Sequence, residues 1–204
     1  GLVGQELQRI LPAAKYVSSK DYNLMDEREV EKMFRDIKPE KVVHLAAHVG
    51  SLNDNIVNRV AYFEDNILMN THVLRQAHKS GVERFIGMLS TCIYPDSISE
   101  YPIKEEILHT GAPHPDLYSY AYAKRCLAVQ IDAYNAQHNT KFNYLIPCNM
   151  YGETCKAHAG RSHYVNALIS KIIEAKKNNS KKIVLFGDGT PLRQFMHARD
   201  LARI

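Results

Sequence analysis

What this sequence lacks excludes several classes of protein. It has no apolar run of about 18 residues, the length a membrane-spanning helix needs, and no secretory signal opens it. Its 4 cysteines form no Cys-x-x-Cys pair and no zinc spacing, so neither a metal site nor a disulfide framework is expected. Free thiols are typical of a reducing cytosol, which predicts a cytoplasmic protein with no membrane partner.

An excess of one charge is also missing. The formal net charge is only +4, and the basic residues are scattered apart from 176–177 and 181–182. No nucleic-acid partner is therefore expected, whereas a mildly basic surface suits an anionic nucleotide substrate. The 45% of hydrophobic and 24% of charged residues are typical of globular proteins. A length of 204 residues suits one domain, or a large domain with part of another.

A polar segment after an apolar run carries the first chemical groups. Residues 85–89 read Phe-Ile-Gly-Met-Leu, which predicts a buried strand. Ser90 and Cys92 follow it directly. They would therefore lie at the carboxyl end of a strand, where open α/β sheets bind their ligands.

A Tyr-x-x-x-Lys pair supplies the second group. Apolar residues at helical spacing predict a helix over 120–138, in which Tyr120 and Lys124 share a face. A phenol can donate a proton, and the charge of a neighbouring ammonium stabilises the phenolate that results. We therefore expect Lys124 to lower the tyrosine pKa. Tyr16 and Lys20 have the same spacing, but in an expected strand, where four residues span roughly 13 Å and the side chains do not meet. Ser90 with Tyr120 and Lys124 therefore suits the reduction of a carbonyl by hydride transfer.

Helix and strand patterns alternate along the rest of the chain, which predicts an α/β fold with a doubly wound parallel sheet. In the usual order 3-2-1-4-5-6, the first strand would precede Gly1, and the last segment would begin a smaller substrate domain. We expect an N-terminally incomplete dinucleotide-binding domain over 1–152 and a partial substrate-binding region over 153–204. Further helices are expected over 2–10, 27–36, 58–79 and 163–177, and further strands over 15–18, 41–47, 142–146 and 181–186.

The set Ser90, Tyr120 and Lys124 resembles the catalytic triad of extended short-chain dehydrogenase/reductases. Three strings resemble one branch of that family, the epimerase-reductases that act on GDP-4-keto-6-deoxy-D-mannose: Ser-Thr-Cys-Ile-Tyr-Pro at 90–95, Pro-Cys-Asn-Met-Tyr-Gly at 147–152, and Ser-His at 162–163. The resemblance implies a Rossmann-type fold, NADP(H) as cofactor, that sugar nucleotide as substrate, and a homodimer. It also implies that Cys92 is a catalytic base and His163 a catalytic acid.

Several residues are expected to bind the cofactor. Gly1 and Gly4 match the second and third glycines of a G-x-x-G-x-x-G turn, whose N–H groups approach the pyrophosphate. The hydroxyls of Ser18 and Ser19, with the Lys20 cation, would accommodate a 2′-phosphate and select NADP, although Asp21 lies one or two residues late. The other expected cofactor contacts are Asp26, which also suits the N-cap of helix 27–36, with Leu45, Ala46, Ala47, Tyr120, Lys124, Pro147 and Asn149.

Substrate contacts follow from the resemblance. Arg193 lies in a stretch, 187–195, that resembles the nucleotide-sugar loop of the family, and a guanidinium suits bidentate recognition of diphosphate. The other expected substrate contacts are Asn149, His163, Tyr164, Lys171 and Phe186. The nearest alternative is a nucleotide-sugar dehydratase or 4-epimerase, but dehydratases typically carry Glu at the position of Cys92. Another alternative is a non-catalytic NADP-binding protein, which would need no proton donor.

Overall fold

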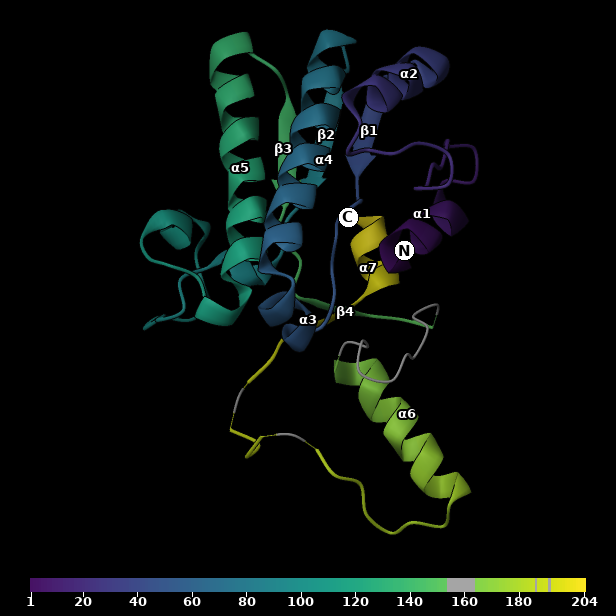
Figure 1. Ribbon diagram of the computed structural model, residues 1–204, viewed down its shortest axis with the longest axis vertical. Coiled ribbons are helices and arrows are strands. Elements are labelled where there is room, and N and C mark those ends of the chain that lie inside the picture. The colour runs from purple at the N-terminus through teal and green to yellow at the C-terminus, as the bar shows by residue number, and fades with distance from the viewer. Residues whose placement is uncertain (154–163, 186, 191) are drawn as a thin grey trace. The chain divides into compact units, whose positions relative to one another are not determined.

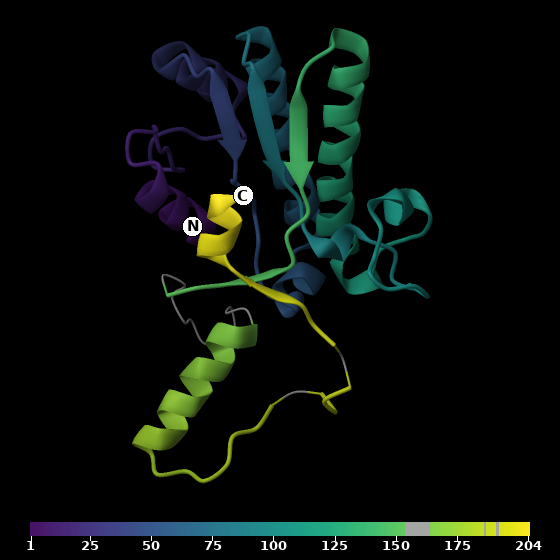
Figure 2. The ribbon, with the colours of Figure 1, turned by 180° about the vertical axis from the view of Figure 1, so that it is seen from behind.

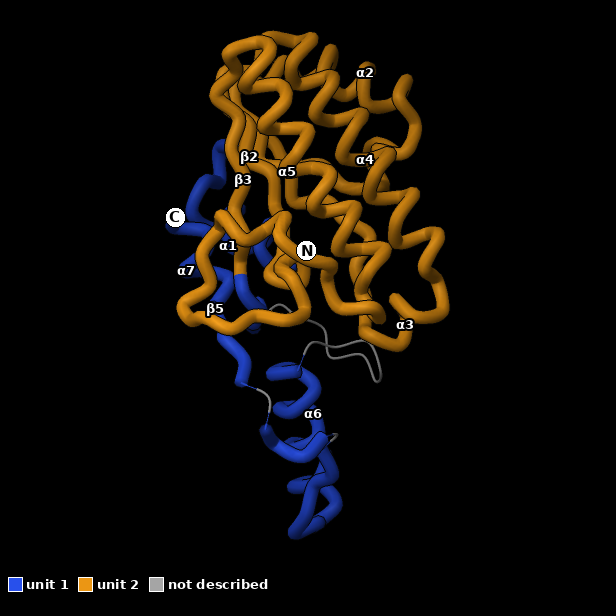
Figure 3. The backbone as a smooth tube through the Cα atoms, turned by 90° about the vertical axis from the view of Figure 1, so that its left-hand side faces the viewer, with its two compact units in different colours: residues 1–14, 148–204 blue, residues 15–147 orange. Residues whose placement is uncertain are grey.

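The computed structural model describes residues 1–153, 164–185, 187–190 and 192–204 of the chain. They divide into two compact units, shown in different colours in Figure 3. One unit is formed by residues 15–147, and the other by residues 1–14 with 148–204. The functional division at residues 152 and 153 stays a prediction.

A three-stranded parallel sheet forms the centre of unit 15–147. Its strands are β1 (Lys41–His44), β2 (Arg84–Met88) and β3 (Phe142–Leu145), and they lie side by side in this order (Figures 1 and 2). Phe85 of β2 pairs with Val42 of β1 and with Phe142 of β3. The parallel sheet confirms the predicted fold class.

Three helices cover one face of this sheet. They are α2 (Glu27–Ile37), α4 (Arg59–Lys79) and α5 (Tyr118–His138), and both views place them on the same side of the strands (Figures 1 and 2). The core between helices and strands is built from apolar side chains of both layers: Val30, Phe34, Leu74, Ala77, Phe85, Leu127, Ile131 and Phe142.

Gly87 sets the distance between α5 and β2. A Cβ atom at this position would lie 3.0 Å from Cδ1 of Ile131 and 3.1 Å from Cδ2 of Leu127. These contacts are tighter than ordinary packing, so a larger residue would push the helix outward. The glycine therefore lets α5 lie close to the strand that leads into the candidate site.

The order of the strands corrects one expectation. In the order 3-2-1-4-5-6, the strands expected at 41–47 and 85–89 would be the third and fourth, with other strands between them. They pair directly instead, from Lys41 with Arg84 to His44 with Gly87. Another strand can therefore join this sheet only beside the outer edge of β1 or of β3.

Two expected strands are not strands. The segment 15–18 has no ladder; it leads into a turn in which the Asp21 carboxylate accepts hydrogen bonds from Ser18. Residues 181–185 are irregular and exposed, with Val184 79% exposed, and they have no strand partner among the described residues. Apolar and β-branched residues predicted a strand there, but a strand needs a neighbour for its backbone hydrogen bonds. Phe186 lies outside the described residues.

The connecting segments contain short helices that the sequence did not predict. The helix α3 (Leu52–Val57) begins after Ser51, whose hydroxyl accepts a hydrogen bond from the Asp54 amide. Between Cys92 and Tyr120 there are two 3-10 turns, η2 (Glu105–His109) and η3 (Pro115–Leu117). Helix α5 also begins two residues before Tyr120, directly after η3.

The unit formed by residues 1–14 and 148–204 contains a small parallel ladder and three helices. The strands β4 (Asn149–Tyr151) and β5 (Phe195–His197) pair with each other, and the helices are α1 (Leu2–Ile10), α6 (Tyr164–Lys177) and α7 (Ala198–Arg203). The Glu6 side chain on α1 is fully buried and bonds Arg9 at 2.7 Å and Arg199 of α7 at 3.4 Å. Neither strand of this ladder is among the strands expected from the sequence. In the described part of the chain, no helix is long and apolar enough to cross a membrane.

Candidate active site

Ser90 and Cys92 lie where the sequence predicts them, just after β2. The Leu89 amide donates to the Leu145 carbonyl at 2.9 Å, which extends the sheet pairing up to the residue before Ser90. Residues Thr91–Ile93 then form one 3-10 turn, η1. The Ser90 hydroxyl accepts a long hydrogen bond, 3.5 Å, from the Cys92 amide. Both side chains are partly buried at the carboxyl end of the strand.

Lys124 fixes α5 to this strand end. The residue is 2% exposed, and its ammonium donates to the Met88 carbonyl at 2.8 Å. The same Nζ atom lies 5.9 Å from the centroid of the Tyr120 ring. One turn of helix therefore places Tyr120 and Lys124 beside the segment that carries Ser90 and Cys92, and the structure brings these four predicted residues together within unit 15–147.

The pKa of Tyr120 moves in the direction opposite to our expectation. Burial raises it above the ordinary tyrosine value, with smaller contributions from Cys92 and Tyr62. Burial also lowers the pKa of Lys124 to about 8. The predicted lowering of the tyrosine pKa by Lys124 is therefore wrong for this structure, because burial disfavours the charged phenolate. A tyrosine that stays protonated at neutral pH suits proton donation.

Cys92 is held as a thiol. Burial raises its pKa, and the hydrogen bond with Ser90 and the charge of Lys124 offset only part of that rise. A thiol acts as a base only after it loses its proton. Its use as a base would therefore be favoured at alkaline pH or by additional positive charge.

A second tyrosine, which the sequence did not single out, packs against Tyr120. Tyr62 is fully buried, and its ring meets the Tyr120 ring edge-on at 6.4 Å and 82°. Its hydroxyl donates to the Asp54 carboxylate at 2.6 Å, while the His48 ring stacks on it at 4.4 Å. A Cβ at Gly50 would overlap the Tyr62 hydroxyl, so this arrangement requires glycine there. The only sequence signal was a buried face of helix 58–79.

Two histidines near β1 have structural partners. His44 is buried and its Nε2 lies 2.9 Å from Oδ1 of Asn70, and burial lowers its pKa to about 4. The Nδ1 atom of His48 lies 2.8 Å from Oδ2 of Asp65. The Asn66 side chain accepts from the amide of His48 and donates to its carbonyl, both at 3.0 Å.

The predicted 2′-phosphate contacts lie in a turn. The Ser18 amide and hydroxyl both donate to Oδ2 of Asp21 at 2.8 Å, and these bonds lower the Asp21 pKa. Asp21 is thus engaged with its own turn, while Lys20 is exposed. Asp26 is the N-cap of α2, because its carboxylate accepts from the Arg28 amide at 2.9 Å. Its contact with a cofactor stays a prediction.

The remaining expected cofactor contacts fall in both units. Helix α1 begins after Gly1 without a side-chain cap, and a Cβ on Gly1 would meet nothing within 4 Å. Open backbone N–H groups at a helix start suit a pyrophosphate, so these residues fit the predicted group. Gly4 lies in the first turn of α1. In unit 15–147, the partly buried Leu45, Ala46 and Ala47 follow β1, and Pro147 follows β3.

The expected substrate residues belong to the other unit. The Asn149 amide donates to the Gln194 carbonyl at 3.1 Å, and Tyr164 stacks on Phe195 at 6.0 Å. Lys171 donates to the Val184 carbonyl at 2.7 Å, and the exposed Arg193 bonds the carbonyl of the residue before it. The contacts of these residues with a sugar nucleotide stay predictions. His163 and Phe186 lie outside the described residues.

Comparison with known proteins decides the family. Residues 6–204 match the sequence model described as the NAD dependent epimerase/dehydratase family. The chain belongs to this family. Among the curated proteins, the chain is similar to a probable GDP-L-fucose synthase of Drosophila melanogaster, 37% identical over 217 residues, which cover all of this chain and 67% of the relative.

Two further proteins are similar to this chain over its whole length. A GDP-L-fucose synthase of Dictyostelium discoideum is 38% identical over 210 residues, covering all of this chain and 65% of that protein. The crystal structure of a GDP-L-fucose synthetase from Naegleria fowleri bound to NADP has a TM-score of 0.90 and 37% identity, covering all of this chain and 68% of that one. The chain thus spans about two thirds of the length of these relatives. The predicted resemblance to extended short-chain dehydrogenase/reductases is confirmed.

Proposed function

We propose that the protein converts GDP-4-keto-6-deoxy-D-mannose to GDP-L-fucose by epimerisation at C3 and C5 and NADPH-dependent reduction at C4. The observation that carries this proposal is the placement of Tyr120 and Lys124 on α5 beside the turn that bears Ser90 and Cys92. The names of the family members cited above, which are GDP-L-fucose synthases, support the choice of substrate.

The cofactor is NADPH in this proposal, which supplies the hydride when bound. The uncapped start of α1 would hold the pyrophosphate, and the turn with Ser18, Ser19 and Lys20 would hold the 2′-phosphate. The NADP in the related Naegleria fowleri structure supports this assignment. Small residues after β1, Ala46 and Ala47, would let the backbone approach the cofactor.

At C4, the ketone oxygen is the atom that needs a proton. Ser90 and Tyr120 would both donate hydrogen bonds to this oxygen, and Tyr120 would transfer its proton. Burial keeps Tyr120 protonated at neutral pH, as a donor must be. The Lys124 ammonium would stabilise the phenolate that remains after this transfer. Without bound substrate and cofactor, burial disfavours the charged forms of both groups.

At C3 and C5, protons on carbon must be moved. Both carbons are α to the C4 ketone, so their protons are acidic once the enolate oxygen is held. Cys92, two residues from Ser90, would remove them, and His163 would return them from the opposite side. The role of Cys92 is supported by its place in the turn η1, whereas that of His163 depends on the family resemblance.

We further propose a homodimer and a cytoplasmic location. The outer sides of α3 and α4 expose apolar residues, with Val57 78% and Val60 67% exposed, and a second copy of the chain would cover them. The oligomeric state would be measured by analytical ultracentrifugation of the wild type and of Val60→Glu. A dimer that Val60→Glu does not weaken would place the interface elsewhere.

The test of function is a reaction in D2O with the keto sugar and NADPH. We expect deuterium at C3 and C5, consumption of one NADPH for each product, and GDP-L-fucose as the product. Consumption of NADPH without deuterium would make the protein a C4 reductase alone. Binding of NADPH without turnover would favour the non-catalytic alternative.

A further inference from the structure

Arg125 is a buried cation with neutral partners. It follows Lys124 directly in α5 and is 5% exposed. Its Nε donates to the carbonyl of Ile93, and its Nη1 donates to the carbonyl of Gly111 at 2.8 Å. Among the described residues, no carboxylate forms an ion pair with it, and its Nη2 has no hydrogen-bond partner. The hydrogen bonds of this guanidinium are made to backbone carbonyls.

Fold stability does not account for this arrangement. Burial lowers the pKa of Arg125, which means that the site disfavours its charge. An unpaired buried charge and an unsatisfied donor both destabilise the folded state, and apolar residues often replace such groups without loss. Groups that break these packing rules are found mostly at functional sites.

The two neighbouring cations enclose the catalytic turn. Lys124 bonds the carbonyl of Met88, two residues before Ser90, and Arg125 bonds the carbonyl of Ile93, the residue after Cys92. Within the turn, the Ile93 amide bonds the Ser90 carbonyl at 3.1 Å, but the bond between the Ser90 hydroxyl and the Cys92 amide is long. The bonds to the helix therefore act together with the burial of Ile93 in the core to hold the turn.

We propose that Arg125 is a positioning residue, which fixes the turn of Ser90 and Cys92 against the helix of Tyr120 and Lys124. The inference rests on the proposed function, in which Cys92 removes protons from carbon. The Arg125 guanidinium also lies 5.2 Å from the centroid of the Tyr122 ring, and this contact favours one orientation of the guanidinium plane. A planar group with several donors can hold two carbonyls at once, which an ammonium cannot do with the same geometry.

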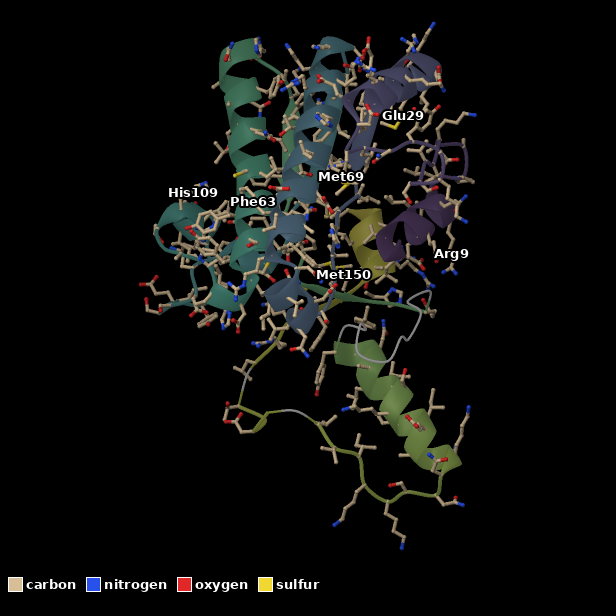
Figure 4. The ribbon with its side chains drawn as sticks, viewed as in Figure 1. Arg9, Glu29, Phe63, Met69, His109 and Met150 are labelled. Carbon is tan, nitrogen blue, oxygen red and sulfur yellow. The ribbon has the colours of Figure 1, made fainter. Side chains whose placement is uncertain are left out.

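The second bond of Arg125, to the carbonyl of Gly111, also connects the helix to the loop 95–114. Figure 4 shows His109 on this loop, beside α5. A cavity of about 340 Å³ lies between loop and helix, lined by His109, Thr110, Gly111, Tyr122, Arg125, Cys126 and Val129. The loop is anchored in the core by the buried Leu108, and the bond from Arg125 to Gly111 adds a polar connection at the edge of this hollow.

The charge of Arg125 acts on Cys92 as well. It is one of the groups that lower the Cys92 pKa, although burial raises that pKa overall. Removal of the guanidinium would thus have two effects on the proposed base: its backbone would be less fixed, and its thiolate would be less stable. Both effects slow proton removal without changing how the cofactor is bound.

The test compares Arg125→Met and Arg125→Lys with Arg59→Met in the intact protein. Arg59 is a matched control, because its Nη1 also donates to a carbonyl of the same region, Pro115, at 3.2 Å, but it does not contact the turn. Two quantities are measured: kcat and KM for deuterium exchange at the α-carbons, and the pH dependence of Cys92 alkylation by iodoacetamide, followed on the Cys92 peptide by mass spectrometry.

In Arg125→Met, we expect kcat to fall by about 10- to 100-fold with KM unchanged, as for a small misplacement of a reacting group. The midpoint of Cys92 alkylation should move to higher pH. Arg125→Lys, which keeps the charge, should recover part of the kcat and part of the shift in midpoint, and Arg59→Met should change neither quantity.

A wild-type kcat and alkylation profile in Arg125→Met would overturn the proposal, and so would failure of both Arg125 variants to fold, because the role would then be to hold the fold. A shifted alkylation midpoint in a protein without exchange activity would refute the proposed function and leave the positioning role intact.

Discussion

The ammonium of Lys124 donates to the carbonyl of Met88 at 2.8 Å, and this bond joins the helix of Tyr120 to the strand that leads to Ser90. Met88 is itself paired with Leu145 in the sheet, so the bond connects α5 to the centre of unit 15–147. The lysine is almost fully buried, which lowers its pKa to about 8. The same burial that fixes its position therefore brings its titration close to neutral pH.

The first prediction concerns the pH dependence of reduction. A group with a pKa of about 8 is charged below that pH and neutral above it. If the Lys124 ammonium stabilises the Tyr120 phenolate, NADPH oxidation by the wild type should fall above pH about 8. A guanidinium stays charged to pH about 12 or higher, so Lys124→Arg should be slower but lose this alkaline decline. The measurement is initial rate against pH with saturating substrates. A decline of the same midpoint in Lys124→Arg would assign it to another group.

The second prediction concerns stability in acid. The pKa of His44 is lowered from 6.5 to about 4, so the unfolded chain binds more protons than the folded one between these values. The contribution of His44 is fully present above pH 6.5 and is lost as the pH falls towards 4. It amounts to at most about 3 kcal/mol of unfolding free energy.

His44→Gln provides the test, because glutamine can still bond Asn70 but does not titrate. Urea unfolding at pH 7 and pH 5 should show a smaller loss of stability for this variant than for the wild type. The exposed His109 is the control, and His109→Gln should behave as the wild type does. Equal acid sensitivity of His44→Gln and the wild type would assign the effect to other groups.

The sequence predicted those helices and strands that have a clear apolar periodicity of their own. The strand after residue 84 and the helix that carries Tyr120 and Lys124 could be recognised from apolar periodicity, since each buries one continuous surface. The segment 15–18 has similar composition but is not a strand. Strand formation depends on a neighbouring backbone, which the segment's own residues do not specify.

The site was predicted in its composition but not in its electrostatics. The spacing of Tyr120 and Lys124 specified their common face, whereas their pKa values depend on how deeply α5 is buried against β2. Tyr62 and Arg125 were not recognised, because their partners lie far along the chain, at Tyr120 and at Ile93. A charged residue directly after Lys124, within an otherwise apolar helix face, was the available signal for Arg125.

The third prediction concerns the choice of cofactor. Lys20 is exposed in a turn whose acidic residue, Asp21, is already bonded to Ser18. If Lys20 contacts the 2′-phosphate, Lys20→Ala should weaken NADPH binding by about 1–3 kcal/mol, the range for a charge-assisted hydrogen bond, and leave NADH binding nearly unchanged. Both dissociation constants can be measured by fluorescence titration of the reduced cofactors. Lys15→Ala, which removes another exposed lysine nearby, should affect neither. Equal weakening of both cofactors would refute a 2′-phosphate contact.

The last prediction separates the two proposed chemistries. Reduction needs a proton for the C4 oxygen, whereas epimerisation needs protons moved on carbon. Cys92→Ala removes the proposed base, so deuterium exchange at C3 and C5 should fall by roughly 10²- to 10⁴-fold, the usual effect of a positioned acid or base. NADPH oxidation should continue in part and give a reduced, unepimerised 6-deoxy sugar. Tyr120→Phe should instead stop NADPH oxidation while some exchange persists, because Ser90 still holds the enolate oxygen.

Exchange and NADPH consumption are measured separately for each variant, with Cys126→Ala as the thiol control on the same helix as Tyr120. Burial raises the Cys92 pKa, so exchange in the wild type should also increase with pH into the alkaline range, and Cys92→Ala should lose that increase. If Cys92→Ala exchanges deuterium at the wild-type rate, Cys92 only packs beneath the sugar and another group removes the protons.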